Sequence, residues 1–489
     1  TKLVLKLNNS VSINLVHQLA EDLKSLGKIV IPVTTMTLLL HSKSVISMLF
    51  LGHLGDAELA GGALALSFAN ITGFSVIKGM SMGMEPICCQ AFGARKLSVI
   101  SQTFQRTLCL LLLTAIIISL LWLNMEPILL FLGQDKDIID VAKLYLRFSI
   151  PELIAQVHLH PLRSFLRTQC ITKPLTIATM LCLFLHFPIN YLLVVHLKLG
   201  VKGVALASAC NTINLDVSLL IYLIFSDKDN VLKPWNGLTF SSPFQGWKTV
   251  LSLAIPSVLA VCLEWWWYEI MLFLCGLLPN PKASVAAMGI LIQTTGLLYV
   301  FPHAISMGLS TCIGHELGAG QPTKAQRMAV VGLVLALTLG VAAFVFTILV
   351  RSLWGTMYTS ETDILSLISV ALPVLGFCEI GNCPQTAACG VLTGSARTTS
   401  GAKINFIAFY LVGLPVAVAL AFWAKAGFVG LWFGLAAAQA ACLCMMIYTL
   451  ITTDWKQQAK RSEELTQENQ TETEIDDHIQ EDLETALLS

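Results

Sequence analysis

Charge is scarce in this sequence. Only 12% of its 489 residues are Asp, Glu, Lys or Arg, whereas 55% are hydrophobic, and the mean hydropathy is +0.73. Soluble globular domains carry roughly 25% charged residues, so this composition excludes an ordinary soluble protein. It is typical of a polytopic membrane protein. The formal net charge is zero at pH 7, and no nucleic-acid partner is expected.

Sequence motifs for catalysis, metal binding and secretion are also missing. The 14 cysteines lie in apolar stretches or at their ends, without a Cys-x-x-Cys pair or a Cys/His cluster, and predict no zinc site. There is no P-loop and no nucleophile with a base. We therefore expect a protein that is not an enzyme and uses no metal or cofactor. Residues 1–28 lack an apolar region with a cleavage site, and we interpret them as a polar cytosolic lead-in.

Long apolar runs dominate the rest of the chain. A helix that crosses about 30 Å of hydrocarbon needs about 20 apolar residues. Twelve runs of this kind predict an all-α membrane protein with twelve transmembrane helices. The predicted spans are 29–51, 60–86, 107–125, 141–162, 174–197, 203–226, 248–278, 284–313, 326–350, 364–392, 402–424 and 428–452.

The distribution of positive charge predicts the orientation. Loops rich in Lys and Arg stay in the cytosol, and with these spans one side of the membrane carries 20 such residues and the other 7. Both termini are therefore predicted to be cytosolic. The segment 453–489 carries 11 acidic residues against three basic ones, which predicts a disordered, solvated acidic tail.

The two halves of the chain resemble each other. Ser81-Met82-Gly83 and Gly93-Ala94 recur 225 residues later as Ser306-Met307-Gly308 and Gly318-Ala319. Further on, Pro188, Gly200 and Gly203 recur 227 residues later as Pro415, Gly427 and Gly430. Glycine suits a left-handed helix end, so Gly93 and Gly318 are predicted to close helices in that conformation.

Six spans per half predict two parallel lobes. Because six is even, both halves start on the same side of the membrane, and their symmetry axis runs along the membrane normal. We predict an N-lobe at 29–226, a cytosolic linker at 227–247 and a C-lobe at 248–452. Two such lobes on either side of a cleft are an arrangement for alternating access.

The seventh span contains the densest polar cluster, Leu263-Glu264-Trp265-Trp266-Trp267-Tyr268-Glu269. Ionised carboxylates cost a few kcal/mol at the centre of a spanning helix and usually mark a polar cavity, a proton relay or a substrate site. Aromatic rings beside a carboxylate suit a flat or cationic organic ligand. The alternative is structural, with the Trp run in the core or at the interface and each Glu facing a polar neighbour.

The spacing of the two acids restricts how they can work together. Glu264 and Glu269 are five residues apart, which separates them by about 140° on a regular helix. They can share one cavity only if the helix bends or unwinds beyond Pro256. Otherwise one of them faces another helix. In the first half, Lys43 is expected to pair with Glu152 or Asp216, or to attract an anionic substrate.

Four segments, together with the twelve spans, make residues 29–452 resemble the multidrug and toxic compound extrusion (MATE) family. These segments are Phe50-Leu51-Gly52-His53-Leu54-Gly55, Cys262-Leu263-Glu264-Trp265-Trp266, Glu316-Leu317-Gly318-Ala319-Gly320 and Gly390-Val391-Leu392-Thr393-Gly394-Ser395. The longer Glu264–Glu269 cluster and Gly381-Asn382-Cys383-Pro384-Gln385-Thr386 resemble the plant detoxification-type branch, which includes abscisic acid carriers. The resemblance implies a fold of two six-helix lobes.

The resemblance also implies proton-coupled antiport in which carboxylates of the C-lobe bind protons and substrate competitively. By position, these are Glu264, Glu269 and Glu379. The implied substrate cavity contains Trp265, Trp267, Tyr268, Gln293, Tyr299, Asn382 and Lys43. Gln293 stands where animal members of the family have an acid, and Lys43 lies near the place of the first-span Asp of prokaryotic members. Both departures weaken the expectation of a strongly cationic substrate or of N-lobe coupling.

The expected partners are a small organic solute, protons and the lipid bilayer, and the driving force is a proton gradient. The solute could be a hormone such as abscisic acid, a secondary metabolite, a xenobiotic or an organic cation. We expect a monomer and favour the plasma membrane over vacuolar, Golgi or endosomal membranes.

Two other classes of membrane protein fit parts of the sequence. A transporter of the major facilitator type also has six plus six spans, but Phe92-Gly93-Ala94-Arg95-Lys96-Leu97 is not its basic loop after the second span. A membrane sensor or regulator of the same fold that recruits partners through the acidic tail remains an alternative.

Overall fold

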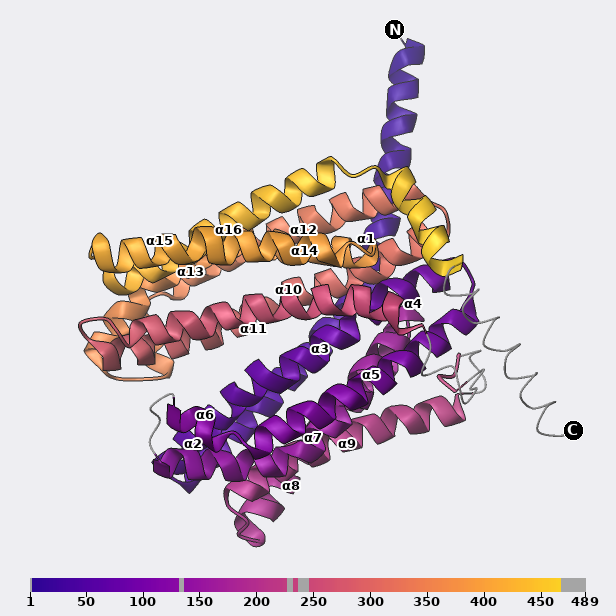
Figure 1. Cartoon of the computed structure of the whole chain (residues 1–489). Helices are drawn as coiled ribbons and strands as arrows, with labels where there is room; N and C mark the ends of the chain where they lie inside the picture. Colours follow the sequence, from indigo (N-terminus) through magenta and orange to yellow (C-terminus); the bar gives the residue numbers. More distant parts are fainter. Residues whose placement is uncertain (1, 132–135, 227–231, 236–245, 468–489) are drawn as a thin grey trace, which may run out of the picture. The chain divides into compact units, whose positions relative to one another are not determined.

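The structure, a computed structural model, describes residues 2–131, 136–226, 232–235 and 246–467, with side chains from residue 16 onward except residue 56. These ranges contain helices and turns and no strand (Figure 1). The first half consists of α1 (Lys2–Leu54), α2 (Asp56–Ala69), η1 (Asn70–Phe74), α3 (Ser75–Met82), α4 (Met84–Gly93), α5 (Leu97–Leu123), α6 (Glu126–Phe131), α7 (Lys136–Thr168), α8 (Lys173–Asn190), η2 (Tyr191–His196) and α9 (Val201–Phe225).

The second half is built in the same way. It consists of α10 (Trp247–Cys275), α11 (Pro281–Gly318), α12 (Pro322–Val350), η5 (Gly355–Met357), α13 (Thr362–Gly394), α14 (Thr398–Asn405), η6 (Phe406–Gly413), α15 (Leu414–Val418), η7 (Ala419–Trp423) and α16 (Gly427–Ile451). Segments α2 to α4 form one continuous rod, as do α8 with η2 and α14 to η7, so each half supplies six long rods.

Eleven of these rods, in the described part of the chain, are long and apolar enough to cross a membrane by length and composition. The predicted span that falls short of this measure is 141–162, which lies in α7. Charged residues along α7, among them Glu152, Arg163 and Arg167, lower its hydropathy. All twelve predicted spans fall on helices, and the predicted all-α fold class is confirmed.

The contacts divide the chain into two compact units. Unit 1 contains residues 2–34 and 266–464, and unit 2 contains residues 35–265 and the described residues after 464. These units share most of their residues with the predicted lobes 29–226 and 248–452, but they divide α1 and α10. In unit 1, for example, Arg327 of α12 forms an ion pair with Asp22 of α1. The predicted lobe boundaries stay a prediction.

Backbone conformation supports the internal duplication. Four positions in the first half and their four equivalents in the second half adopt positive φ. The pairs are Arg95 (59°) with Gly320 (68°), Cys170 (59°) with Ala396 (57°), Lys198 (50°) with Lys425 (55°), and Gly200 (59°) with Gly427 (57°). L residues rarely adopt this region, so chance does not explain four such pairs at nearly constant separation.

The predicted left-handed glycines are placed differently. Helices α4 and α11 end at Gly93 and Gly318, as predicted, but the left-handed residues are Arg95 and Gly320, two positions later. The amide of Lys96 donates to the carbonyl of Ala91 at 2.8 Å, a hydrogen bond that closes the helix end. In this motif the residue after the C-cap is the left-handed one. The prediction for Gly93 and Gly318 themselves was therefore wrong.

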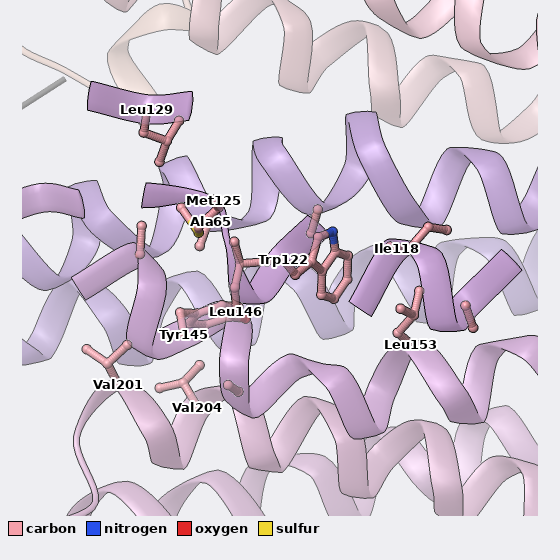
Figure 2. Packing of buried hydrophobic residues seen from close by; sticks show 14 of the residues in the cluster. Ala65, Ile118, Trp122, Met125, Leu129, Tyr145, Leu146, Leu153, Val201 and Val204 are labelled. Atoms are coloured by element: carbon pink, nitrogen blue, oxygen red, sulfur yellow. The ribbon is translucent and has the colours of Figure 1, made fainter. Parts of the chain in front are cut away.

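Trp122 is the centre of the apolar core of unit 2 (Figure 2). Its side chain is fully buried, and its ring meets Phe74 edge to face with 5.5 Å between centroids. Its Nε1 donates to Thr72 Oγ1 at 3.0 Å, so the indole brings no unsatisfied donor into the core. Gly73 lies against the same ring, where a Cβ would meet the indole.

The described segments near both ends of the chain are helical. Residues 2–28 belong to α1, and residues 455–467 are helical, with Trp455 only 8% exposed. The expectation of disorder across 453–489 is therefore wrong for 455–467, because this segment buries apolar surface. Residues 468–489 lie outside the described chain, as do 227–231 and 236–245 of the predicted linker. Within this linker, the described residues 232–235 contact α5 through Ser101, whose hydroxyl donates to the carbonyl of Lys233 at 3.1 Å.

Glycine allows two helices of unit 1 to touch. At Gly390 of α13, a Cβ would lie 2.7 Å from the Cα of Ser306 in α11, well inside contact distance. We expect Gly390→Ala to lower the free energy of unfolding by about 1–3 kcal/mol, since an added methyl group at this close approach forces the backbone to shift. Thermal unfolding of the purified protein in detergent measures this loss. Gly289→Ala in α11 is the control, because nothing lies within 4 Å of its Cβ position. Equal melting temperatures for the two variants would contradict the contact.

Candidate functional site

Helix α10 carries the predicted carboxylate and aromatic cluster without interruption. It is a regular α-helix from Trp247 to Cys275, with Pro256 inside it. Glu264 and Glu269 therefore point about 140° apart, and the bent or unwound segment that would aim both at one cavity is not formed. The contacts assign Glu264 to unit 2 and Glu269 to unit 1. Both side chains are half-buried.

Glu264 faces a lysine in unit 2. Lys78 of α3 is close enough for its charge to attract that of Glu264, and its Nζ lies 5.9 Å from the ring centroid of Trp265. In the described chain, neither Glu264 nor Glu269 forms a hydrogen bond or a direct ion pair with a side chain. These two carboxylates are therefore available to a proton or a ligand.

The aromatic residues of the cluster have different environments. Trp265 is 43% exposed and Trp267 is fully buried, with its ring centroid 5.6 Å from that of Phe409 and its edge against Gly413. Trp267 thus packs between helices of unit 1 and does not face open space in this conformation. Tyr268 is half-buried. The structural alternative fits Trp267, and the ligand-facing interpretation fits Trp265.

Glu379 of α13 lies in a buried polar cluster of unit 1. Its Oε2 accepts hydrogen bonds from Asn382 Nδ2 at 3.0 Å and from Cys383 Sγ at 3.7 Å. The amide oxygen of Asn382 in turn accepts from Gln439 Nε2 of α16 at 3.3 Å. Glu379 and Asn382 are both only 2% exposed. Asn382 therefore orients the carboxyl group, and Gln439, which the sequence did not single out, orients Asn382.

The predicted cavity residues of α11 are separate from this cluster. Gln293 is exposed, and the half-buried Tyr299 stacks on His303 with 5.4 Å between ring centroids. An apolar groove in unit 1 contains none of the predicted site residues. It is lined by Val30, Thr34, Phe301, Ile305, Leu335, Thr338, Leu339 and Ala342.

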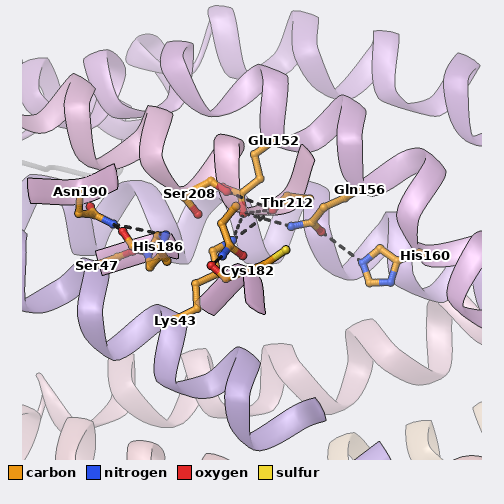
Figure 3. A network of polar contacts seen from close by, with 11 residues as sticks. Lys43, Ser47, Glu152, Gln156, His160, Cys182, His186, Asn190, Ser208 and Thr212 are labelled. Atoms are coloured by element: carbon orange, nitrogen blue, oxygen red, sulfur yellow. Dashed lines mark hydrogen bonds and ion pairs between the residues drawn. The ribbon is translucent and has the colours of Figure 1, made fainter. Parts of the chain in front are cut away.

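Lys43 is at the centre of a polar network in unit 2 (Figure 3). Its Nζ lies 2.7 Å from Glu152 Oε1 and donates to Thr212 Oγ1 at 3.2 Å. The side chains of Lys43 and Glu152 are only 13% and 6% exposed. Of the two partners expected for Lys43, Glu152 is therefore confirmed, and Asp216 pairs with His158 instead, with 2.7 Å between Nδ1 and Oδ1.

The network continues along α7. Gln156 donates to Glu152 at 3.4 Å, and Gln156 Oε1 and His160 Nε2 are 3.2 Å apart (Figure 3). A second branch joins Ser47 Oγ and His186 Nε2 at 3.1 Å, and Asn190 donates to the carbonyl of His186 at 2.9 Å. The sequence analysis missed Gln156, His160 and His186. The spacing of 152, 156 and 160, four residues apart on one helix face, is the signal that could have found two of them.

A further ion pair joins Glu85 of α4 to Arg167 of α7, and Ser164 donates to Glu85 Oε1 at 2.9 Å. Among the acids inside the spans of the first half, Glu85 and Glu152 thus sit in direct ion pairs, and Asp216 contacts the imidazole of His158. Glu264 and Glu269 of α10 have no such direct partner among the described side chains. The first half therefore supplies partners for its own acids, whereas α10 leaves two carboxylates without a direct one.

Comparison with known proteins places this geometry in a class of membrane transporters. The chain is 61% identical to Protein DETOXIFICATION 53 and 54% identical to Protein DETOXIFICATION 48, both of Arabidopsis thaliana. These matches cover 92% and 91% of this chain and 92% and 83% of the relatives. Its structure matches the crystal structure of the eukaryotic MATE transporter AtDTX14 with a TM-score of 0.86 at 31% identity, over 92% of this chain and 100% of that one.

A more distant structure shares the fold. The Vibrio cholerae MATE transporter VcmN matches with a TM-score of 0.80 at 18% identity, over 90% of this chain and 99% of that one. The MatE family model matches residues 32–192 and 256–419, one segment in each half. The chain belongs to the MATE family and is a multi-pass integral membrane protein. The resemblance seen in the sequence is confirmed.

The buried pair Lys43–Glu152 provides a test of the network. We expect Lys43→Met and Glu152→Leu each to lower the free energy of unfolding by about 3–5 kcal/mol, because each leaves a buried charge without its partner. The double variant should recover most of this loss, since neither charge remains. Unfolding of the purified protein in detergent measures all three. A double variant whose loss equals the sum of the two single losses would show that the pair contributes nothing.

Proposed function

We propose that this protein is a proton-coupled antiporter that exports a small organic solute by alternating access. The observation that carries the proposal is the contrast between the acids of the first half and those of α10. Glu85 and Glu152 sit in direct ion pairs and Asp216 contacts the imidazole of His158, but Glu264 and Glu269 do not pair directly with another described side chain. An ionised carboxylate in apolar surroundings is costly without a counter-ion. A proton or a bound solute can neutralise these carboxylates, for which the protein provides no direct counter-ion.

Competition between these two neutralising species produces the exchange. If the proton and the solute bind the same carboxylate in turn, each lowers the affinity for the other by the same factor. A proton gradient then drives the solute in the opposite direction. We assign this role to Glu264, Glu269 and Glu379. For Glu379, Asn382 would keep the carboxyl group oriented in either protonation state, because an amide does not ionise.

The internal duplication supports the assignment. The first copy places Lys43 in its first span and Glu152 in its fourth, where the two opposite charges neutralise each other. The second copy places Glu269 and Glu379 in the equivalent spans, the seventh and the tenth, so both groups carry the same sign. The first copy is thus electrostatically complete, whereas the second requires protons or a cation.

For the solute we propose a class of small organic molecules. Trp265 offers an exposed ring beside a carboxylate, which suits a flat or cationic organic molecule, and Tyr268, Gln293, Tyr299 and Lys43 are proposed further contacts. The relatives named Protein DETOXIFICATION favour a xenobiotic or a secondary metabolite, and a hormone such as abscisic acid is also compatible. We propose a monomer in the plasma membrane with both termini in the cytosol.

Neutral amides in place of the acids test the proposed coupling. We expect Glu264→Gln, Glu269→Gln and Glu379→Gln each to reduce uphill efflux by about tenfold or more, because an amide cannot exchange a proton for solute. Transport is measured in proteoliposomes with an imposed pH gradient and a panel of organic cations, polyphenols, hormones and citrate.

Glu361→Gln is the matched control. Glu361 is exposed at the start of α13, the helix that carries Glu379, and its side chain does not cap that helix. This variant should transport like the wild type. Full uphill transport by the Glu264 and Glu269 variants, with correctly folded protein, would reject the assignment.

Removal of the acidic tail separates a carrier from a regulator. Deletion of residues 468–489 leaves the helix at 455–467 and the buried Trp455 in place. We expect this variant to retain uphill transport in proteoliposomes, since the proposed exchange uses only groups in the spans. Loss of transport with intact folding would favour the alternative in which the tail recruits partners.

A further inference from the structure

We propose that Lys78 is a built-in counter-ion of Glu264 that a cationic cargo must displace, so that Lys78 determines how tightly the site formed by Glu264 and Trp265 binds cations. The proposal rests on the proposed function and deepens it, because it names a residue that determines specificity. It concerns residues of unit 2 only.

The packing of α3 and α4 against the first part of α10 fixes the position of Lys78. Small residues allow the backbones to touch: a Cβ on Gly79 would lie 2.6 Å from Val258 Cα, and a Cβ on Gly83 would lie 2.5 Å from Ala254 Cα. One turn away, Ser75 Oγ lies 3.6 Å from Cys262 Sγ. Residues 75, 79 and 83 thus face 262, 258 and 254 in antiparallel register. Lys78, beside Gly79, is held next to the Glu264 and Trp265 pair.

Lys78 makes the contacts that an organic cation would make. Its ammonium lies 5.9 Å from the ring centroid of Trp265, within the range of a cation–π interaction. It also lies close enough to Glu264 for their charges to attract. The two groups are not in direct ion-pair contact within the described chain, unlike Lys43 and Glu152. The ammonium can therefore leave without breaking a short hydrogen bond.

The neighbouring charges do not replace this pairing. The other groups that act on Lys78 are Glu85, Arg163 and Arg167, and His160 lies near Lys78 and Arg163. Glu85 is already paired with Arg167. Lys78 is the one charged group that acts on Glu264 among the described residues. Lys78 and Glu264 therefore act as counter-charges for each other.

Competition for one carboxylate follows from this arrangement. A cargo cation and the Lys78 ammonium repel each other, so the cargo gains Glu264 and the face of Trp265 only when the flexible lysine side chain moves aside. Trp265 has an accessible ring for this purpose, with 43% of its surface exposed. When Glu264 takes up a proton, the charge of Lys78 stays behind and repels the cation. Protonation therefore removes the attraction for the cation and leaves the repulsion in place.

Equilibrium binding tests the proposal without a proton gradient. We measure binding of ethidium, a flat organic monocation, to the purified full-length protein in lipid nanodiscs at several pH values. Lys78→Gln should tighten binding by about tenfold, because it removes one repelling charge at close range. It should also move the pH dependence of binding to higher pH, because Glu264 then holds its proton more tightly. Lys78→Arg, which keeps the charge, is the matched control and should bind like the wild type. In a Glu264→Gln background, Lys78→Gln should again tighten binding, because the lysine charge repels the cation even when the carboxylate is absent.

A second measurement needs no ligand. The infrared carbonyl stretch of protonated Glu264, identified by its loss in Glu264→Gln, should appear at a pH about one unit higher in Lys78→Gln than in the wild type, since an attracting positive charge is gone. An unchanged midpoint would overturn the proposal, as would ethidium binding that is unaltered or weaker in Lys78→Gln. Neither measurement depends on transport. Failure of proton-driven efflux with both results as expected would reject the proposed function and leave the role of Lys78 intact.

Discussion

The cost of charge in apolar surroundings is the constraint on which the account depends. Every carboxylate inside a spanning helix needs a counter-ion, a proton or strong hydrogen bonds. The first half of the chain meets this need internally through Lys43 with Glu152, His158 with Asp216 and Arg167 with Glu85. Helix α10 does so only loosely, with Lys78 attracted to Glu264 across a gap and Glu269 without a direct partner in the described chain. A proton or a cationic cargo that binds these carboxylates therefore supplies the missing neutralising charge.

The duplication explains how one fold can contain acids with direct partners in one half and acids without direct partners in the other. The two copies share left-handed residues at equivalent helix ends, such as Gly200 and Gly427, which are backbone features. Their polar side chains have diverged, so that equivalent spans carry a lysine and an acid in one copy and two acids in the other. A regular α10 also separates the directions of Glu264 and Glu269. The two acids of this helix therefore lie in different environments: Glu264 lies beside Lys78 in unit 2, and Glu269 lies among the residues of unit 1.

Much of the fold could be predicted from the sequence, because apolar length and repeated glycines are local signals. The twelve helical spans and the duplication follow from them. The charge of Lys43 inside a span predicted a partner, and the structure selects Glu152 from the alternatives that the sequence left open. The features that could not be predicted depend on tertiary contacts and on the hydrogen bonds at helix ends. The left-handed residues lie two positions after Gly93 and Gly318 because the helix-end hydrogen bonds, not the glycine, set the place. The burial of Trp267 against Phe409 depends on a distant helix. The contacts of His186 with Ser47 and of Lys78 with Trp265 required knowledge of which helices touch, since each joins residues far apart in the chain.

The central claim is that cargo and protons compete for carboxyl groups in the membrane. The most direct measurement is calorimetric titration of the purified protein with a transported cation, in buffers that differ in their enthalpy of ionisation. The slope of the observed enthalpy against the buffer enthalpy counts the protons released on binding. The account predicts that cargo binding releases protons, up to about one for each coupled carboxyl group at pH values below the midpoint of its titration, and that fewer are released in Glu264→Gln. Cargo binding without any proton release at every pH between 5 and 8 would contradict it.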